Sequence, residues 1–352
     1  MSLEIGLQAM DLKMTPRVPR LEFDAEVHWD LVKAVVGLEI NEQSSEEQRR
    51  QASLAFMREW NYDLRLEPLI SHETVAKKST NMGHAEYAWG GSDFNRDIHC
   101  PFETVEEVLQ FDPMKCYGEI DKKETTERFN HAYRENCRKF PNVVNSTGTY
   151  ITLFSGFIAI FGWEMLLTAG GVAPRRLGEV ANRYAEWMQQ YYNALAECEA
   201  EVIYSHDDIV WTSGAVFHPE WYRTYIFPNY KKYYAPLLEA GKKIIFLSDG
   251  NYTEFIDDIA ATGVHGFFIE PLTDLCYLTE KYGQSHVIIG NADTRILLGG
   301  SRTDIRNEVK RCMDLGKKCP GYFMGVSNMM PPNTPVENAL YYNEVYQRLC
   351  KR

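Results

Sequence analysis

From about residue 140 onward, the chain repeats one pattern: a short apolar run that ends in polar residues, then a longer segment with helical periodicity. This alternation predicts parallel strands joined by helices. The predicted strands are Asn142–Tyr150, Glu201–Asp208, Lys243–Gly250, Val264–Pro271, His286–Asp293 and Gly321–Asn328. The predicted helices between them include Leu177–Ala196, Tyr252–Thr262 and Thr303–Leu315.

Two weaker strand candidates, Arg20–Glu26 and Asn61–Ile70, bring the number of predicted strands to eight. Eight strand and helix units in 352 residues predict an α/β fold of the (β/α)8 TIM-barrel class, as a single domain over residues 1–352. The alternative is an open doubly wound sheet, which would favour a glycine-rich phosphate turn after an early strand. Neither GxGxxG nor GxxxxGK[ST] occurs in the sequence, so we favour the barrel. Residues 72–140 are interpreted as an insertion after the second strand that forms a lid over the barrel mouth.

Charge and composition exclude several classes of partner. The formal net charge of −12 disfavours nucleic acid and anionic membranes. The longest apolar run, Ile151–Leu167, is interrupted by polar residues and glycines and falls short of the roughly 20 residues of a membrane span. The N-terminal MSLEIGLQAMDLKM shows no signal-peptide pattern, and the eight cysteines contain no CxxC pair. A cytoplasmic protein with reduced thiols is therefore expected.

Polar residues at the carboxyl ends of the predicted strands indicate where a site would form, because those ends build the active sites of barrel enzymes. A carboxylate beside an imidazole fixes its tautomer and raises its pKa, which makes the His206-Asp207-Asp208 run the most informative. Asp207 ranks lower, since alternate residues of a strand face opposite sides. The alternative role for such aspartates is to cap the next helix. The candidate catalytic residues are His206, Asp208, Asp249 and Glu270.

A second group of polar residues is predicted to bind substrate. Arg17 and Arg20 have the chemistry to hold a carboxylate, with surface solvation or an internal ion pair as the alternative. An acidic and amide-rich mouth suits an amide-rich or cationic ligand, proton transfer by carboxylates, or a hard metal held by oxygen atoms. The metal is left open. The candidate substrate-binding residues are Arg17, Arg20, Asp63, Tyr150, Asn251, Asn291 and Asn328.

Several stretches resemble a known family. GNADTRILLGGSRTDIRNEVKRC and PPNTPVEN (residues 331–338) resemble two signatures of the uroporphyrinogen decarboxylase superfamily. HDDIVWTSGAVFHPEWYRTYIFPNYKK and GKKIIFLSDGN resemble its fourth and fifth strands with their loops, and NSTGTYITLFSGFIAIFGWEMLL resembles the segment before them. The resemblance implies a single (β/α)8 barrel.

The superfamily holds two chemistries, and the first is decarboxylation of a tetrapyrrole. Uroporphyrinogen decarboxylases open with an arginine-rich MRQAGR segment that meets the substrate propionates, whereas this chain has RVPRLEFDAEVHW. Arg17 and Pro19 match the start of that pattern, and Asp63 matches the family aspartate that contacts the pyrrole nitrogens. The rest of the arginine-rich segment is missing, and an acidic mouth supplies few cations for a substrate with many carboxylates.

The second chemistry is corrinoid-dependent methyl transfer. It uses a zinc ion held by an HxC pair after the fifth strand and by a cysteine near the last one, and the zinc-bound thiolate accepts the methyl group. Here Leu247 and Asp249 occupy the HxC positions, and no cysteine lies near Asn328, so a zinc-thiolate mechanism is disfavoured. The resemblance is nevertheless closer to this branch.

The resulting hypothesis is a methyltransferase that passes a methyl group between a small methylated substrate and a corrinoid (cobalamin) carried by a partner protein. Two alternatives stay open: a carboxy-lyase acting on a uroporphyrinogen-like tetrapyrrole, and a non-catalytic corrinoid or tetrapyrrole-binding protein. A homodimer formed over Tyr341, Tyr342 and Tyr346 is considered, with packing of these rings onto the barrel as its alternative.

Overall fold

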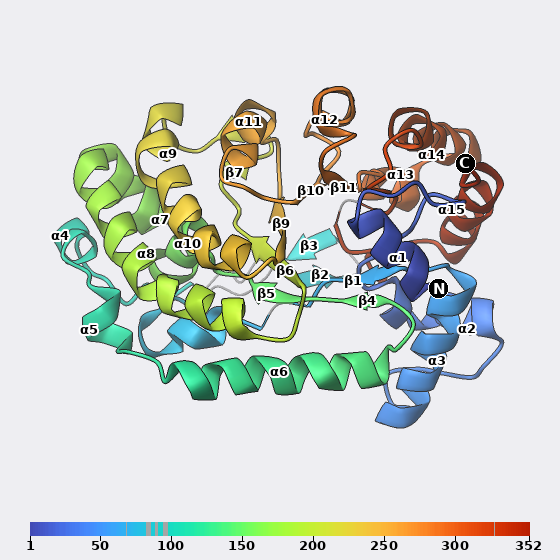
Figure 1. The fold of residues 1–352 in the computed structure, drawn as a ribbon, viewed down its shortest axis with the longest axis horizontal. Coiled ribbons are helices and arrows are strands. Elements are labelled where there is room, and N and C mark those ends of the chain that lie inside the picture. Colours follow the sequence, from blue (N-terminus) through green and yellow to red (C-terminus); the bar gives the residue numbers. More distant parts are fainter. Residues whose placement is uncertain (68, 82–85, 89–90, 94–97, 327) are drawn as a thin grey trace.

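The computed structural model describes residues 1–67, 69–81, 86–88, 91–93, 98–326 and 328–352. Strands lie at the centre of the molecule and helices surround them (Figure 1). The strands are β1 (Leu64–Arg65), β2 (Glu86–Ala88), β3 (Gly91–Asp93), β4 (Val144–Asn145), β5 (Thr147–Thr149), β6 (Val202–His206), β7 (Val210–Trp211), β8 (Gly214–Ala215), β9 (Lys243–Ser248), β10 (Gly266–Ile269), β11 (Val287–Ile289) and β12 (Tyr322–Phe323).

Helices connect most successive strands of the central sheet, as expected for parallel pairing. The α-helices are α1 (Leu3–Met10), α2 (Trp29–Val36), α3 (Glu46–Glu59), α4 (Val105–Leu109), α5 (Pro113–Tyr117), α6 (Lys122–Lys139), α7 (Phe154–Val172), α8 (Pro174–Glu197), α9 (Pro219–Tyr225), α10 (Phe227–Glu239), α11 (Ile256–Ala260), α12 (Leu275–Tyr282), α13 (Thr294–Gly299), α14 (Arg302–Gly316) and α15 (Val336–Leu349). The 3-10 helices are η1 (Ala25–Val27), η2 (His72–Lys78) and η3 (Thr253–Phe255).

Within the described residues, six parallel strands form one sheet in the order β12-β11-β10-β9-β6-β5. β1 pairs with β4 in parallel, and α6 lies between these two strands in the sequence and runs along one edge of the molecule (Figure 1). β7 and β8 form a short antiparallel hairpin after β6. The observed architecture is an α/β fold with a mainly parallel sheet.

A segment near residue 20 lies between β1 and β12. Arg20 forms isolated parallel bridges with Tyr62, just before β1, and with Met324, just after β12. The amide of Asp63 donates to the carbonyl of Arg20 (2.9 Å), and the amide of Leu21 donates to the carbonyl of Met324 (3.1 Å). The predicted strand Arg20–Glu26 is thus present only as bridges.

The last residues described pair with the segment that precedes Arg20. Arg17 and Lys351 form an antiparallel bridge, and the amide of Arg352 donates to the carbonyl of Pro16 (3.0 Å). The Arg352 guanidinium also donates to the carbonyl of Cys319, at 2.6 Å. Residues 16–17 are therefore bonded to residues 351–352.

Alternation along the strands separates two apolar cores. On β6, Tyr204 packs in a core that lines the inner side of the strands, whereas Ile203 packs in a larger core between strands and helices. Gly148 on β5 allows close packing against β6, because a Cβ atom there would lie 1.9 Å from the carbonyl oxygen of Tyr204. The inner core consists of Ala9, Met10, Leu21, Leu64, Leu66, Val144, Val202, Tyr204, Ile245, Leu247, Phe268, Val287, Ile289 and Phe323.

Helix α1 covers the amino ends of several strands. Its carbonyl at Met10 contacts Nε2 of His265, just before β10, at 2.7 Å. The amide of Ser2, which caps this helix, donates to Asp63 just before β1 at 3.0 Å. The opposite end of the sheet, where the strands finish, is therefore the end left for a site.

Helix α7 is divided by Gly162, whose φ of 70° and ψ of 164° are not helical. Glycine tolerates this positive φ because it has no Cβ atom. Among the described helices, α7 alone is long and apolar enough to cross a membrane, but 56% of its most apolar window is buried inside the fold. Its burial and its contacts with α4 and α8 identify it as a core helix.

The predicted strands and helices agree well with the structure. Each of the six predicted strands after residue 140 contains an observed strand, and α8 and α14 extend the predicted helices by one to three residues at each end. Within the predicted lid region 72–140, residues 82–85, 89–90 and 94–97 lie outside the described residues, and η2, β2, β3, α4, α5 and α6 form its described parts. Of the three tyrosines considered for a dimer surface, Tyr342 and Tyr346 are fully buried inside the chain, and Tyr341 is partly buried against the core.

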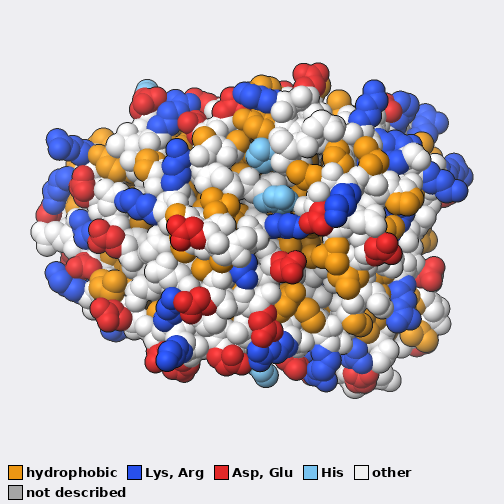
Figure 2. Space-filling view, in the orientation of Figure 1, with side chains coloured by type: hydrophobic (Ala, Val, Ile, Leu, Met, Phe, Trp, Pro, Cys, Tyr) orange, Lys and Arg blue, Asp and Glu red, His pale blue; other side chains and the backbone are white. Residues whose placement is uncertain are grey.

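The surface carries charges of both signs. On the face drawn in Figure 2, acidic and basic side chains alternate at short range and hydrophobic side chains occur in small groups. The ion pairs among the described residues include Arg176 with Glu106 and Arg134 with Glu199. Exposed pairs of this kind add little stability.

Candidate functional site at the carboxyl ends of the strands

Five polar residues meet where β6, β9, β10 and β12 end. The strand period of two places His206, Asp249 and Glu270 on the inner side of the sheet, beyond the inner-core residues Tyr204, Leu247 and Phe268. We call the group that they form with Asp208 and Asn328 the strand-end cluster. Its members are His206, Asp208, Asp249, Glu270 and Asn328.

His206 is almost fully buried and is held at both ring nitrogens. Its Nε2 lies 3.1 Å from Oδ1 of Asp208, and its Nδ1 lies 2.9 Å from the carbonyl oxygen of Tyr150. The Tyr150 ring stacks on the imidazole with 3.8 Å between centroids. Burial lowers the pKa of His206, but the charge and hydrogen bond of Asp208 outweigh it, with Asp249 and the Tyr150 carbonyl adding to the effect, and raise the pKa to about 9. His206 is therefore an imidazolium at neutral pH.

Asp249 is placed between two other carboxylates. Its amide donates to Oδ1 of Asp208 (2.9 Å), and its Oδ2 accepts a hydrogen bond from Nδ2 of Asn328 (3.3 Å). Burial raises the pKa of Asp249 well above its usual value, and the charges of Asp208 and Glu270 raise it further. Asp249 consequently keeps its proton to a higher pH than an ordinary aspartate does.

Glu270 completes the acidic side of the cluster. Its Oε2 accepts from the amide of Gly250 (2.7 Å), and its Oε1 accepts from Nδ2 of Asn328 (3.1 Å). Burial raises the pKa of Glu270, while the hydrogen bonds from Gly250 and Asn328 act in the opposite direction. One amide group of Asn328 thus joins Asp249 to Glu270.

The alternation along β6 separates Asp207 from this site. Asp207 accepts hydrogen bonds from the amides of Phe154 (3.0 Å) and Ser155 (2.5 Å) and from the hydroxyl of Tyr230. It binds the first turn of α7 on the outer side of the sheet, as a helix-capping aspartate would. Its lower ranking in the sequence agrees with this placement.

The arginines and the aspartate that precede β1 lie away from the cluster. Arg17 binds Asp63 through two hydrogen bonds of 2.7 and 2.8 Å, and Asp63 also accepts from the amides of Ser2 and Arg20. Arg20 is fully buried, pairs with Glu22 at 2.7 Å, and lies against the rings of Trp60, Tyr342 and Tyr346. The internal ion pair, which was the alternative for these arginines, is the observed arrangement.

The two remaining predicted residues, Asn251 and Asn291, bind the chain itself. Oδ1 of Asn251 accepts from the amide of Thr253 (3.1 Å) and so starts η3. Asn291 is fully buried, and its Nδ2 donates to the carbonyls of Glu270 (3.1 Å) and Thr273 (3.3 Å). Neither side chain belongs to the strand-end cluster, although Asn291 is bonded to the backbone of Glu270.

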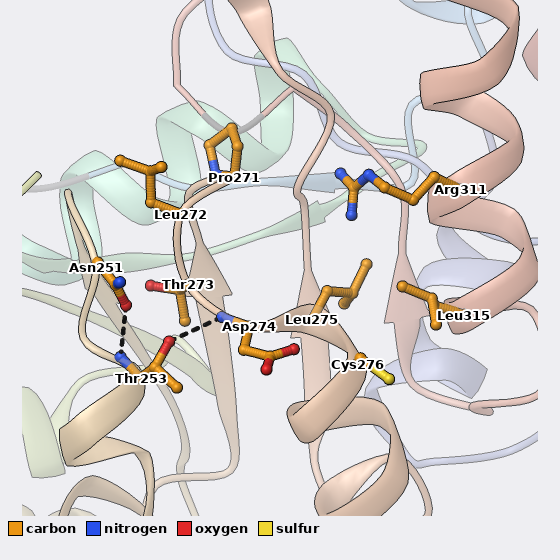
Figure 3. Close-up of a pocket in the computed structure, with 10 residues that line it drawn as sticks. All are labelled: Asn251, Thr253, Pro271, Leu272, Thr273, Asp274, Leu275, Cys276, Arg311 and Leu315. Carbon is orange, nitrogen blue, oxygen red and sulfur yellow. Dashed lines mark hydrogen bonds between the residues drawn. The ribbon is translucent and has the colours of Figure 1, made fainter. Parts of the chain in front are cut away.

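A cavity of about 490 Å³ opens beside the loops that follow β9 and β10 (Figure 3). Asn251 is the one predicted site residue in its wall, and the charged members of the strand-end cluster do not line it. The site is therefore defined by the cluster rather than by this cavity. The lining residues are Asn251, Thr253, Pro271, Leu272, Thr273, Asp274, Leu275, Cys276, Arg311 and Leu315.

Tyr204 and Arg311 are residues near the site that sequence reasoning missed. Tyr204 lies two residues before His206 on the same face, and burial, then the charges of Asp249 and Asp208, raise its pKa well above the usual value. The period of the strand was a signal for it. Arg311, on α14, contacts Asn291 from 20 residues away in sequence, and no local pattern indicates that contact.

The cluster lacks the ligands of a zinc-thiolate site. Leu247 is buried in the inner core and Asp249 is a carboxylate, while all eight cysteines are free thiols. Among the residues that the structure describes, no group of three or more His, Cys, Asp or Glu side chains is arranged to hold a metal ion. What the cluster offers is an imidazolium and a carboxyl group of raised pKa beside two further carboxyl groups, an arrangement that suits a proton donor.

Comparison with known proteins relates this chain to one family. The family model "Uroporphyrinogen decarboxylase (URO-D)" matches residues 161–349. The uroporphyrinogen decarboxylase of Carboxydothermus hydrogenoformans is 27% identical over 219 residues, which cover 61% of each protein. That of Thermus thermophilus is 28% identical over 168 residues, covering 48% of this chain and 47% of the relative. The matches thus span less than two thirds of these curated relatives.

A solved structure shares the fold over nearly the whole chain. The methyltransferase from Methanosarcina mazei superposes with a TM-score of 0.63 at 16% identity, and the match covers 99% of both chains. The resemblance drawn from the sequence motifs is confirmed. Because the family model matches more than half of the chain, this protein belongs to the uroporphyrinogen decarboxylase family.

Proposed function

We propose that this protein is a methyltransferase that moves a methyl group between a small methylated substrate and a corrinoid carried by a partner protein. The observation that carries the proposal is the strand-end cluster, in which Asp208 binds both His206 (3.1 Å) and the amide of Asp249 (2.9 Å). The pKa is raised at both His206 and Asp249, so the cluster contains two candidate proton donors. The fold shared with the Methanosarcina mazei methyltransferase supports it.

In this proposal, the chain's own residues supply the proton that demethylation requires. As the bond between the methyl carbon and an oxygen or nitrogen atom breaks, its electron pair stays on the oxygen or nitrogen, which takes a proton from Asp249 or His206. Burial, and then the charges of Asp208 and Glu270, raise the pKa of Asp249 and so favour its protonated form before that step. Asn328 holds Asp249 and Glu270 in a fixed relation through its amide group.

The corrinoid acts in this scheme as a co-substrate that accepts the methyl group, and it belongs to the partner protein. The residues present do not fit a zinc-activated thiol acceptor, because Leu247 and Asp249 replace the soft ligands. The proposal therefore runs from methylated substrate to corrinoid and includes no step through zinc.

Decarboxylation of a uroporphyrinogen-like tetrapyrrole is the second candidate, favoured by the names of the curated relatives. The geometry speaks against it. Among the described residues of the strand-end cluster, one cation, His206, faces three carboxyl groups, and Arg17 is bound to Asp63. A substrate with many carboxylates would meet repulsion at this mouth.

The test is demethylation measured with reduced cobalamin and a panel of methoxylated and methylated amine substrates. We expect methylcobalamin to form with the native protein, and its rate to fall by at least about 100-fold in Asp249→Asn, the size of effect typical of a lost general acid. Asp314→Asn, which alters an exposed ion pair with Lys310, is the matched control.

Two parallel measurements would support the alternative functions. Carbon dioxide release from a porphyrinogen, without methylcobalamin, would establish the decarboxylase. Absorbance changes on adding cobalamin or a porphyrin, without turnover of any substrate, would establish a binding protein.

We also propose that the strands close into a single-domain (β/α)8 barrel in the cytoplasm. The bridges of Arg20 to Tyr62 on one side and Met324 on the other support closure, since they connect β1 to β12. The free thiols of all eight cysteines suit a reducing compartment. A crystal structure that left the edge between β12 and the Arg20 segment unpaired would refute closure.

A further inference from the structure

Arg311 lies between the outer cavity and the buried Asn291. Its guanidinium extends from α14 into the wall of the cavity, opposite the loop that carries Pro271 and Leu272 (Figure 3). Glu308, one helical turn earlier, accepts hydrogen bonds from Nε (3.0 Å) and Nη2 (2.6 Å) of Arg311. These two bonds to Glu308 fix the orientation of the Arg311 guanidinium.

The same Nη2 atom grips Asn291 at two points. The backbone carbonyl and the side-chain Oδ1 of Asn291 each lie 3.0 Å from Nη2, and they share its two hydrogens with Glu308. Because these bonds occupy Oδ1, the amide nitrogen of Asn291 must point away from Arg311. The orientation of the Asn291 side chain is thus set by Arg311.

The amide nitrogen of Asn291 in turn holds the loop after β10. It donates to the carbonyls of Glu270 (3.1 Å) and Thr273 (3.3 Å). Thr273 is bonded to the neighbouring loop through its hydroxyl, which donates to the carbonyl of Gly250 (2.9 Å) and accepts from the amide of Tyr252 (3.1 Å). The backbone of Glu270 is therefore held by Asn291.

The carboxylate of Glu270 then bonds forward, to the amide of Gly250 at 2.7 Å and to Asn328 at 3.1 Å. We infer that Arg311 and Asn291 are positioning residues that hold Glu270 against Gly250 and Asp249 from outside the strand-end cluster. This inference rests on the proposed function for its catalytic meaning, because there Glu270 adds to the rise of the Asp249 pKa that burial and Asp208 cause.

Amide hydrogen exchange provides a test that needs no substrate. The amide of Gly250 is bonded to Glu270, whereas the amide of the preceding residue, Asp249, is bonded to Asp208. In Arg311→Ala we expect exchange at Gly250 to accelerate by about tenfold or more, the value of a hydrogen bond to a charged group, with exchange at Asp249 unchanged. General loosening of the fold would accelerate both amides equally and would overturn the inference, as would no change at either.

Chemical rescue and two further variants sharpen the result. The space left by Arg311→Ala joins the open cavity, so millimolar guanidinium should restore protection at Gly250. Asn291→Asp keeps an acceptor for Arg311 but loses the donor to Glu270, and should also expose Gly250 selectively. Lys310→Ala is the matched control, because Lys310 is the neighbouring residue and pairs with Asp314 at the surface.

The effect on the proposed reaction is a shift of its pH profile. If Glu270 moves away from Asp249, the pKa of Asp249 falls, and the demethylation rate of Arg311→Ala should decline at a lower pH than that of the native protein. Absence of demethylation in the native protein would refute the proposed function alone, since the exchange measurement would still decide the positioning of Glu270.

Discussion

At the scale of residues, the strand-end cluster places charges where they reduce stability. Asp249 is partly buried beside Asp208 and Glu270, and it is bonded to one neutral donor, Asn328. Such arrangements persist at functional sites because the surrounding fold stabilises them. Sequence reasoning found all five members of the cluster at the ends of strands. It could not predict which of them contact one another, because those distances depend on the register of the sheet.

Asp249→Asn should therefore make the protein more stable, and more so at alkaline pH. The pKa of Asp249 is higher in the folded protein than in the unfolded chain, so the native protein loses stability as pH rises through the folded pKa. The asparagine variant does not titrate, and we expect a gain of about 1 kcal/mol in the free energy of unfolding at pH 8 and less at pH 5. Urea denaturation at the two pH values measures it. An equal change at both values, or a loss at pH 8, would contradict the assignment.

At the scale of elements, strand packing depends on contacts that side-chain patterns do not reveal. The sequence predicted the strand positions after residue 140 because apolar runs and turn residues are local signals. It could not show that β5 approaches β6 so closely that Gly148 has no room for a Cβ atom. It also could not show that Gly162 divides α7.

Two glycine substitutions compare a position that has no room for a Cβ atom with a position that has open space. Gly148→Ala should lower the free energy of unfolding by at least about 2 kcal/mol, since its methyl group would overlap the carbonyl of Tyr204. Gly171→Ala, near the end of α7 with open space around it, should raise that free energy by about 0.5 kcal/mol through helix propensity. Thermal unfolding of both variants gives the comparison. A stable Gly148→Ala would show that β5 and β6 can separate.

At the scale of the whole molecule, Arg17 and Asp63, which precede β1, stabilise the fold by joining distant parts of the chain. The pair of Arg17 and Asp63 lies at the end of the sheet opposite the strand-end cluster, together with the N-cap Ser2 of α1. Burial raises the pKa of Asp63, and the Arg17 guanidinium opposes that change. Sequence reasoning assigned Arg17 to substrate binding because an arginine can hold a carboxylate, and Asp63 because it matches an aspartate of the resembled family. Only the direction of the strand and its partners separates the two ends.

Asp63→Asn should accordingly reduce stability and leave the reaction intact. Removing one partner of this buried pair is expected to cost about 3 kcal/mol, because Arg17 then lacks a counter-charge. The KM for substrate should stay unchanged at a temperature where the variant is folded. Glu106→Gln, which removes an exposed pair with Arg176, is the control and should cost less than about 1 kcal/mol. A raised KM with normal stability would return Asp63 to the substrate site.

The bridge between Arg17 and Lys351 has a consequence for the order of events during synthesis. The segment around Arg20 leaves the ribosome early, but the partners that hold it at Met324 and near Lys351 emerge some 300 residues later. The nascent chain must keep this edge unpaired while the central strands form, which exposes it to chaperones and to misassociation. Force measured on arrested nascent chains should rise late, once residues beyond 350 have cleared the exit tunnel, and a full rise before residue 320 emerges would contradict this order.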